Sequence, residues 1–411
     1  MTNKLKLTLL SGVAAFAASM MPAGQAYATF GMLPSCVGTE KCGMGGAGSA
    51  KAAAAVDAAM NPALAGKMGN EYQINLGWFW ADVKGITTIG DVQTEMTSGA
   101  GDFPNGSLGV NYKIDDTTSF NISIVPGGGG ASDWPTGRQG AGFPATKNED
   151  QNVDYKMVYL QPSVSYKYDA GTTLGIGAIL SRATMDTDSA QGSFQPSGVE
   201  GVSETFYGVG FQVGAVWDLP ENGSFAVSLR SPVWHQDTGV YDNVVFTDPI
   251  DTPAQALLGL TFDVTPSTSI SLDYKYVAWS SVATIGNSSN DPTTASRGFG
   301  WVDQNIFMIG VEHKIDDSLQ IRAGVSHANS PIDEGHVLAN FLFPAIVETH
   351  FTAGATYTMG NGMKLGASGY ITPTAKKVDD LSVFGAANGV TRASILKHQQ
   401  KGFQLSVSQE F

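Results

Sequence analysis

Few residues in this chain have the types and spacing that chemistry requires. Gly43, Gly45 and Gly48 match the spacing of a dinucleotide-binding fingerprint, but that fingerprint needs a preceding strand and a βαβ unit, which the surrounding sequence does not offer. The six histidines, at positions 235, 313, 327, 336, 350 and 398, show no metal-ligand spacing, and no Gly-x-Ser-x-Gly nucleophile elbow occurs. We therefore predict no catalytic residue, no metal site and no cofactor.

The N-terminus carries the pattern of an export signal. Lys4 and Lys6 give a positive start, residues 7–21 form an apolar run, and Ala26-Tyr27-Ala28 is a small-x-small cleavage site. A retained membrane anchor is the alternative, which the short and interrupted apolar run disfavours. We predict a signal peptide over residues 1–28 and a mature chain that starts at Thr29.

The two cysteines, Cys36 and Cys42, fall near the start of that mature chain. In an exported protein an isolated pair with no histidine nearby favours a disulfide over a metal site or a redox pair. Such a small loop contributes about 2 to 3 kcal/mol at most, so its expected role is to pin the N-terminal segment.

Composition narrows the class of protein. The 411 residues are 42% hydrophobic and 15% charged, with a net charge of -14. This acidic balance argues against nucleic acid as a partner, because nucleic acids attract a basic surface. The 50 glycines follow no collagen period, and favour turns and strands that approach other backbone closely.

The elements that dominate the chain are strands of alternating polarity. Within residues 268–276, Ile270, Leu272 and Tyr274 lie on one face, and the opposite face carries Asp273 and Lys275 among serines. About fourteen segments of this kind follow one another, each long enough to cross a bilayer at a tilt. They are residues 71–82, 106–113, 119–125, 155–168, 172–185, 204–218, 224–234, 254–264, 267–279, 303–314, 318–327, 348–358, 363–371 and 401–411.

The connections between these segments alternate between tight turns and long loops. Asp115-Asp116 and Asp316-Asp317 are typical of the turns, and residues 127–154 and 375–400 of the loops, which run to roughly 17 to 28 residues. A soluble β-sandwich has no reason to alternate so regularly. The pattern predicts an all-β fold, a 14-stranded antiparallel transmembrane β-barrel in the outer membrane of a Gram-negative bacterium.

Aromatic residues near the strand ends fit an interfacial girdle around such a barrel. They are Trp78, Trp80, Tyr166, Tyr168, Trp217, Trp234, Tyr276 and Trp279. The final strand ends in Phe411, which resembles the C-terminal signal read by barrel-assembly machinery. We expect that machinery and outer-membrane lipid as partners.

Residues 43–63 are too small and too rich in glycine to form a core of their own. Alanines predict a short helix within residues 49–60, with Ser49 as N-cap and Asn61-Pro62 as the stop. We predict that residues 29–70 form a small helical hatch that plugs the lumen, and that residues 71–411 form the barrel.

Taken together, these features resemble the FadL/TodX (OMPP1) family of outer-membrane transporters for long-chain fatty acids and other hydrophobic compounds. The resemblance covers essentially the whole mature chain. Its most specific parts are the hatch with Asn61-Pro62-Ala63, residues 231–239, Asp273-Tyr274-Lys275-Tyr276 followed by Trp279, and residues 319–324.

The resemblance implies a monomer with no enzymatic activity and a route for a hydrophobic small-molecule ligand. The ligand is captured at an apolar outer loop, reaches a pocket against the hatch, displaces the hatch, and leaves where the third strand kinks. Candidate residues are Gly45, Gly46, Asn61, Pro62 and Ala63 for the hatch site, Val337, Leu338, Phe341, Leu342 and Phe343 for capture, and Ile124, Pro126 and Gly127 for the lateral gate.

Physical chemistry supports the gate and the capture loop. Proline removes a ladder donor and glycine packs no side chain, so Pro126-Gly127 breaks strand pairing or simply ends the strand. An apolar patch exposed on an outer loop marks binding.

Passive uptake of a fatty acid or an aromatic hydrocarbon is the leading function. A general diffusion porin is the alternative, and an outer-membrane lipase is a third possibility. The residue types do not distinguish a fatty acid from an aromatic hydrocarbon as the substrate.

Overall fold

The computed structural model describes residues 30–89, 92–134, 151–187, 203–239, 249–289, 298–379 and 392–411, so the predicted signal peptide lies outside the described residues. The strands are β1 (Glu71–Ile89), β2 (Val92–Thr97), β3 (Asp102–Lys113), β4 (Thr118–Trp134), β5 (Gln151–Lys167), β6 (Thr172–Thr187), β7 (Glu204–Leu219), β8 (Gly223–Arg230), β9 (Trp234–His235), β10 (Gln255–Thr265), β11 (Thr268–Val277), β12 (Gln304–Lys314), β13 (Leu319–Ala328), β14 (Thr349–Thr358), β15 (Lys364–Ile371), β16 (Ala375–Asp379) and β17 (Arg392–Glu410). The helices are α2 (Thr39–Cys42), α3 (Ala283–Gly286) and the 3-10 turns η1 (Ala55–Ala59), η2 (Pro62–Lys67), η4 (Trp279–Ser281) and η6 (Ala339–Phe341). None of the helices in these ranges has the length and apolar character needed to cross a membrane.

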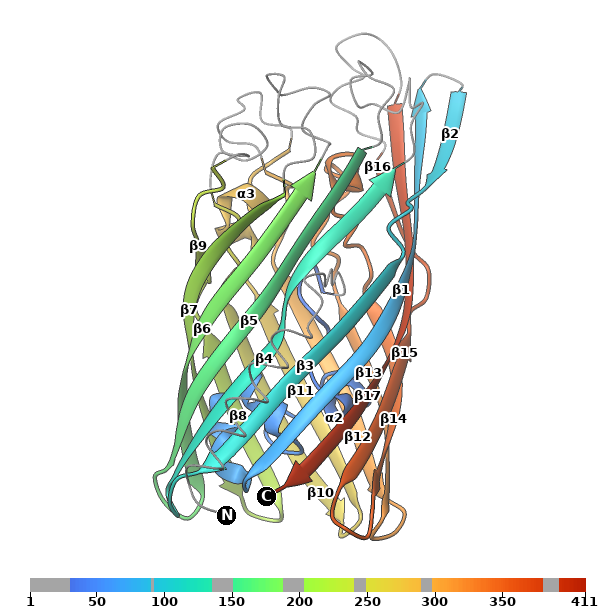
Figure 1. Cartoon of the computed structure of the whole chain (residues 1–411). Coiled ribbons are helices and arrows are strands. Elements are labelled where there is room, and N and C mark those ends of the chain that lie inside the picture. Colours follow the sequence, from blue (N-terminus) through green and yellow to red (C-terminus); the bar gives the residue numbers. More distant parts are fainter. Residues whose placement is uncertain are drawn as a thin grey trace.

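The strands close into a single antiparallel barrel, as Figure 1 shows. β1 pairs with β17 along its whole length, from Glu71 opposite Glu410 to Ile89 opposite Arg392, and this pairing joins the first and last strands. The short strands β2, β9 and β16 continue a neighbouring wall strand beyond an interruption, which leaves fourteen strands in the wall. The predicted fold class is confirmed, and each of the fourteen predicted segments overlaps one wall strand.

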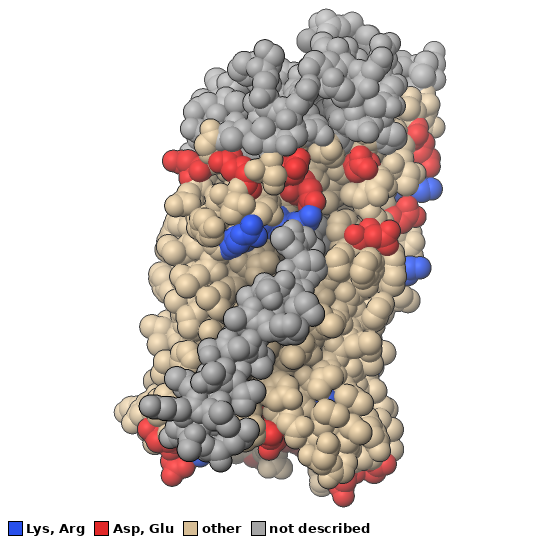
Figure 2. All heavy atoms as spheres, in the orientation of Figure 1, with Lys and Arg blue, Asp and Glu red and all other residues tan. Residues whose placement is uncertain are grey.

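Alternation along the strands sorts side chains between the lipid face and the lumen. On β1, Leu76 is 65% exposed whereas its neighbour Asn75 is 1% exposed. A lipid-facing surface needs apolar side chains because hydrocarbon cannot hydrogen-bond, whereas the lumen can hold polar ones. In Figure 2 the middle of the visible wall is almost free of charged side chains, which gather toward its two ends.

The lumen face itself changes character along the barrel axis. On β5 it begins at the short-turn end with Ser163 and Gln161 and continues toward the loops with Tyr159, Met157 and Tyr155, all of them buried. The polar part surrounds the hatch, whereas the apolar part belongs to a large hydrophobic cluster in the upper barrel. The barrel interior above the hatch therefore contains a large apolar region.

Several predicted boundaries and positions were wrong. Four stretches of the predicted loops belong to strands: 127–134, 151–154, 375–379 and 392–400. The reason is that β4 extends to Trp134, β5 begins at Gln151, β16 continues the line of β15, and β17 begins at Arg392. Trp279 is not part of an interfacial girdle. It is 1% exposed, its Nε1 donates to Gln304 Oε1 at 2.8 Å, and its ring contacts Trp301 inside the barrel.

Residues 30–70 lie within the barrel, and Figure 1 shows their blue segments enclosed by the wall. Within residues 49–60 the predicted helix is replaced by the short 3-10 turn η1, which Ser49 does not cap, and a second turn, η2, begins at the predicted stop. Asn61 accepts a hydrogen bond from the Ala63 N–H at 3.1 Å and Pro62 takes the first helical position, so this pair starts η2. The small residues favour close packing against the wall over a regular helix.

Candidate functional site: a cavity beside an opening in the barrel wall

The pairing between β3 and β4 stops part-way up the wall. It runs from Lys113 opposite Ser119 to Leu108 opposite Ile124, and β3 continues to Asp102 paired with β1 alone. β4 also continues past Ile124, paired with β5 alone. The connection between β2 and β3 approaches β4 again where the Gly99 N–H donates to the Asp133 carbonyl at 2.6 Å. An unpaired interval therefore opens between β3 and β4.

The sequence of β4 explains this interval. Pro126 has no N–H to donate, and a β-bulge between Pro126 and Gly128 shifts the register against β5. Gly127 lies so close to Tyr159 that a Cβ atom there would be 2.5 Å from its ring. The sequence had suggested that this strand ends at Val125. Instead, the strand continues through the bulge and bends inward there.

The N-terminal segment lies against the interior side of the interval. The Gly129 N–H of β4 donates to the Met32 carbonyl at 2.8 Å. Phe30, Met32 and Leu33 are each at most 2% exposed. Because the backbone of this segment bonds directly to β4, it stands between the unpaired interval and the centre of the lumen.

A cavity of about 80 Å³ lies between the hatch and the wall at this height. It is lined by Leu33, Pro34, Ser35, Cys36, Val37, Gly46, Ala59, Met60, Val125, Pro126, Gly127, Gln212, Ser228, Arg230, Gln255, Leu257, Lys275 and Met308. Val125, Pro126 and Gly127 belong to the unpaired interval, so the cavity adjoins this interval. Cys36, disulfide-bonded to Cys42, holds the hatch side of the lining.

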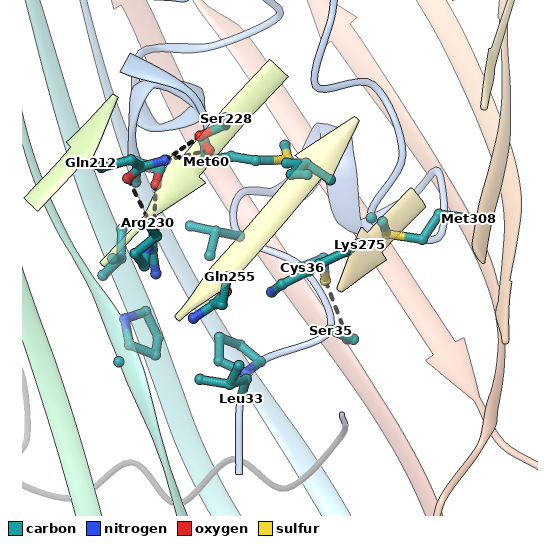
Figure 3. A pocket seen from close by; sticks show the side chains of 18 residues that line it. Leu33, Ser35, Cys36, Met60, Gln212, Ser228, Arg230, Gln255, Lys275 and Met308 are labelled. Atoms are coloured by element: carbon teal, nitrogen blue, oxygen red, sulfur yellow. Dashed lines mark hydrogen bonds between the residues drawn. The ribbon is translucent and has the colours of Figure 1, made fainter. Parts of the chain in front are cut away.

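The polar side of the cavity is rich in hydrogen-bond donors. Gln212, Arg230 and Gln255 stand directly opposite one another on β7, β8 and β10, and Lys275 follows on β11. Figure 3 shows these side chains among the residues that line the cavity, with Met60 beside Gln212 and Leu33 near Gln255. The described lining residues include two basic side chains and no carboxylate.

These donors are unequally used. The Arg230 Nη2 donates to the Ala59 carbonyl at 2.8 Å and to Gln212 Oε1 at 3.2 Å, so this guanidinium also holds the hatch. The buried Gln255 Nε2 has no hydrogen-bond partner among the described residues. Lys275 Nζ donates no hydrogen bond to any described residue either. A buried donor without an acceptor is costly, so the cavity favours a ligand that accepts hydrogen bonds.

The hatch packs against glycines of the wall. At several lumen-facing positions a Cβ atom would overlap hatch atoms: Gly109 against Val56, Gly175 against Ala63, Gly214 against Asn61, Gly259 against Ser49, and Gly310 and Gly324 against Met44. Gly45 makes the reverse contact, since its own Cβ atom would meet the Val325 backbone at 2.9 Å. Because glycine has no side chain, the glycines on both surfaces allow the hatch backbone to pack directly against the wall.

Polar contacts fix the hatch in one orientation. The Gly48 and Ser49 N–H groups donate to the Asp273 carboxylate of β11 at 3.1 and 2.9 Å. Within the hatch, Lys41 Nζ lies 3.4 Å from Asp57 Oδ2, and both side chains are buried. Burial raises the pKa of Glu40, while nearby Arg322 lowers it.

The predicted capture loop does not form an exposed apolar patch, which corrects the reason for which it was chosen. Val337, Phe341 and Phe343 are at most 2% exposed, and Leu338 and Leu342 are half-buried. The Phe341 ring packs on Trp134 at the top of β4, and the Phe341 carbonyl accepts from the Trp134 Nε1 at 2.8 Å. The loop is folded into the barrel mouth, against the loop end of β4.

The structure brings together only some of the predicted site residues. Gly46, Pro126 and Gly127 line the cavity, and Ile124 is the last residue of β4 paired with β3. Asn61, Pro62, Ala63 and Gly45 contact the wall away from the cavity. No group of three or more potential metal ligands occurs among the described residues.

Sequence reasoning missed the donors of the cavity. Alternation had placed Lys275 on the polar face of its strand, which indicates a lumen position, but nothing local to β8 or β10 indicated that Arg230 and Gln255 lie beside it. Only the register of neighbouring strands brings them together.

Comparison with known proteins decides the family. The model of the outer membrane protein transport protein family (OMPP1/FadL/TodX) matches residues 19–382. The chain belongs to this family. It is therefore an outer-membrane β-barrel protein of a family that transports hydrophobic compounds.

Solved structures of FadL/TodX proteins share the fold. The toluene transporter TodX of P. putida is 16% identical, with a TM-score of 0.69 over 92% of this chain and 99% of that one. A FadL homologue of Pseudomonas aeruginosa is 17% identical, with a TM-score of 0.70 over 92% and 99%. The toluene transporter TbuX of Ralstonia pickettii is 16% identical, with a TM-score of 0.65 over 92% and 99%. Among curated proteins none matches this chain.

Proposed function

We propose that this protein is a passive uptake channel for hydrophobic carboxylic acids, which leave the barrel sideways between β3 and β4. The observation that carries the proposal is the cavity beside the unpaired interval, whose lining combines apolar residues with Arg230, Gln255 and Lys275. An apolar tail and an acceptor-rich head group suit that mixed lining.

The route begins at the mouth. The apolar upper lumen and the folded loop with Phe341 and Phe343 offer contacts that a hydrophobic solute cannot find in water. A water-filled pore lacks such contacts, which argues against general diffusion. Capture then occurs inside the mouth, where Leu338 and Leu342 remain partly accessible.

Passage requires the N-terminal segment to move. The cavity of about 80 Å³ is smaller than a cavity of roughly 150 Å³ that admits benzene. The Met32 carbonyl is also bonded to Gly129 across the opening. Displacing residues 30–37 enlarges the cavity and clears the interval between β3 and β4 in one movement.

Lateral exit fits the physical chemistry of the solute. A hydrophobic acid that left through the base of the barrel would have to pass the polar lumen around the hatch, where Gln73 and Asn75 are buried. A sideways exit at the height of the cavity delivers it to the membrane instead. The residues at this exit are Val125, Pro126 and Gly127 of β4.

The chemistry of the donors separates two substrate classes. TodX and TbuX are toluene transporters, and toluene is an uncharged ring. The cavity of this chain presents two basic side chains and the free Gln255 amide, which an uncharged hydrocarbon cannot use. A carboxylate accepts hydrogen bonds from all three.

The experiment compares two solutes in one strain. Replacing Lys275 with Gln removes one charge-assisted hydrogen bond, worth about 1.5 to 3 kcal/mol, so uptake of a hydrophobic carboxylic acid at low concentration falls roughly tenfold or more. Uptake of a neutral aromatic of similar size stays within about twofold. Equal losses for both solutes, or no loss for either, would refute the assignment of the acid as substrate.

A further inference from the structure

Three lysines stand in register on the lipid-facing surface near the loop end of the barrel. Lys84 of β1 is directly opposite Lys397 of β17, which is directly opposite Lys376 of β16. Directly opposed residues share one face of a sheet, with Cβ atoms about 5 Å apart. Lys84 and the exposed Trp80 lie an even number of positions apart along β1, so both side chains point to the same face. This face is the outer one. We call Lys84, Lys397 and Lys376 the lysine row.

The row begins where the apolar belt ends. Outward side chains of β17 run Val407, Leu405, Phe403 toward the loops, and the next outward residue is Lys401. Its Nζ lies 5.7 Å from the centre of the Trp80 ring. Aromatic rings mark the membrane interface in outer-membrane barrels, and the long loops face the cell exterior. The lysine row is therefore at the height of the head groups of the outer leaflet.

The charges of the row are poorly compensated by the protein. Lys84 Nζ lies 3.7 Å from Glu95 Oε1, and no ion pair to Lys376, Lys397 or Lys401 occurs among the described residues. Like charges directly opposite one another destabilise a sheet. Lys156, at the same end of the barrel, is paired with Asp154. The row thus differs from Lys156, because two of its three lysines have no ion pair among the described residues.

We infer that the lysine row binds the phosphate groups of a phosphorylated lipid of the outer leaflet. Its acyl chains lie along Phe403, Leu405 and Trp80, and its phosphates reach the amino groups above them. A lipid fits better than a free anion because the basic side chains are continuous with the apolar belt. Figure 2 shows basic and acidic side chains together on the upper part of the outer wall, above a middle that is almost free of charge.

The test uses the full barrel in detergent micelles and native mass spectrometry. Bis-phosphorylated lipid A and the same lipid with its phosphates removed are titrated against the wild type and a Lys84→Gln, Lys376→Gln, Lys397→Gln variant. Each lysine near an anionic lipid contributes about fivefold in affinity, so the variant binds the phosphorylated lipid about a hundredfold more weakly. The wild type binds the dephosphorylated lipid as weakly as the variant does.

Two further variants keep the result interpretable. Lys113→Gln, Lys167→Gln, Lys314→Gln makes the same charge change at the short-turn end of the barrel and leaves binding within about threefold. Replacing the three lysines of the row with Arg retains the charge and retains binding. Equal binding of the two lipids by the wild type, equal loss in the short-turn control, or unchanged binding in the row variant would overturn the inference.

Discussion

At the scale of single residues, the short turns share one device. Asp115, Asp169 and Asp316 each accept backbone hydrogen bonds from residues two and three positions later. Hydrogen bonds to the ionised carboxylate lower the pKa of each Asp. The main donor is the Thr117 N–H for Asp115, the Gly171 N–H for Asp169 and the Ser318 hydroxyl for Asp316. The repeated Asp therefore stabilises the turns that join neighbouring strands.

A pH dependence follows for the Asp115 turn. A lowered pKa in the folded protein means a stabilising contribution that is present above the ordinary value of 3.8 and is lost as pH falls through the folded pKa. We expect protection of the Thr118 amide from hydrogen exchange to decline between about pH 5 and about pH 2, after correction for intrinsic rates. Asp115→Asn removes this pH dependence, and an unchanged profile in that variant would contradict the assignment.

Residue types alone indicated part of the site. The positions of Lys275 and of Pro126-Gly127 were readable from alternation and from backbone chemistry. Burial of Phe341 and Phe343 was not, because an apolar loop has the same composition whether it lies on the surface or folds into a barrel mouth. The recognition of Phe411 by assembly machinery stays a prediction.

At the scale of elements, the contact between hatch and wall depends on glycine. A Cβ atom added at Gly175 overlaps the Ala63 backbone, which has no flexible side chain that could move away. We expect Gly175→Ala to lower barrel stability by about 1 to 3 kcal/mol or to displace the hatch and raise aqueous conductance in planar bilayers. Gly69→Ala serves as the control, because no atom lies within 4 Å of its added Cβ.

The same measurement separates the uptake channel from a porin. The wild type should show no large steady aqueous conductance, since the hatch rests directly on the wall at several strands. A porin-like conductance in the wild type, unchanged in Gly175→Ala, would mean that the hatch does not restrict the lumen.

The loop above the opening gives a second prediction at this scale. Leu342 is half-buried and packs against the hydrophobic cluster of the mouth. Replacing it with Ser removes about 1 kcal/mol of apolar contact, so uptake of a hydrophobic acid at low concentration falls about fivefold. Ile315→Ser, which changes an exposed residue of a short turn, leaves uptake unchanged. Equal uptake by the Leu342 variant and the wild type would remove the loop from the route.

β4 shows why element boundaries were harder to predict than element existence. Pro126 and the glycines after it have the composition of a strand end followed by a loop. In the structure the pairing with β5 continues through a bulge, and only the pairing with β3 is lost. Local sequence reports a break in hydrogen bonding, but not on which edge of the strand it occurs.

At the scale of the whole molecule, the barrel was predictable because two periodic signals agree. Period-two alternation defined the wall strands, and alternating turn lengths gave their up-and-down order, so closure follows from the need to satisfy strand edges in a membrane. The apolar filling of the upper lumen was not predicted, since it depends on side chains contributed by many strands and loops.

The central claim is that a hydrophobic acid passes the cavity and leaves between β3 and β4. The most direct measurement is photo-crosslinking of a diazirine-bearing long-chain carboxylic acid to the protein in outer membranes, with the modified residues mapped by mass spectrometry. We expect adducts on Leu33 and on Val125 to Gly127, reduced roughly tenfold in Lys275→Gln. Adducts confined to Gly66 and Lys67 at the short-turn end of the hatch, with none on β4, would contradict the account.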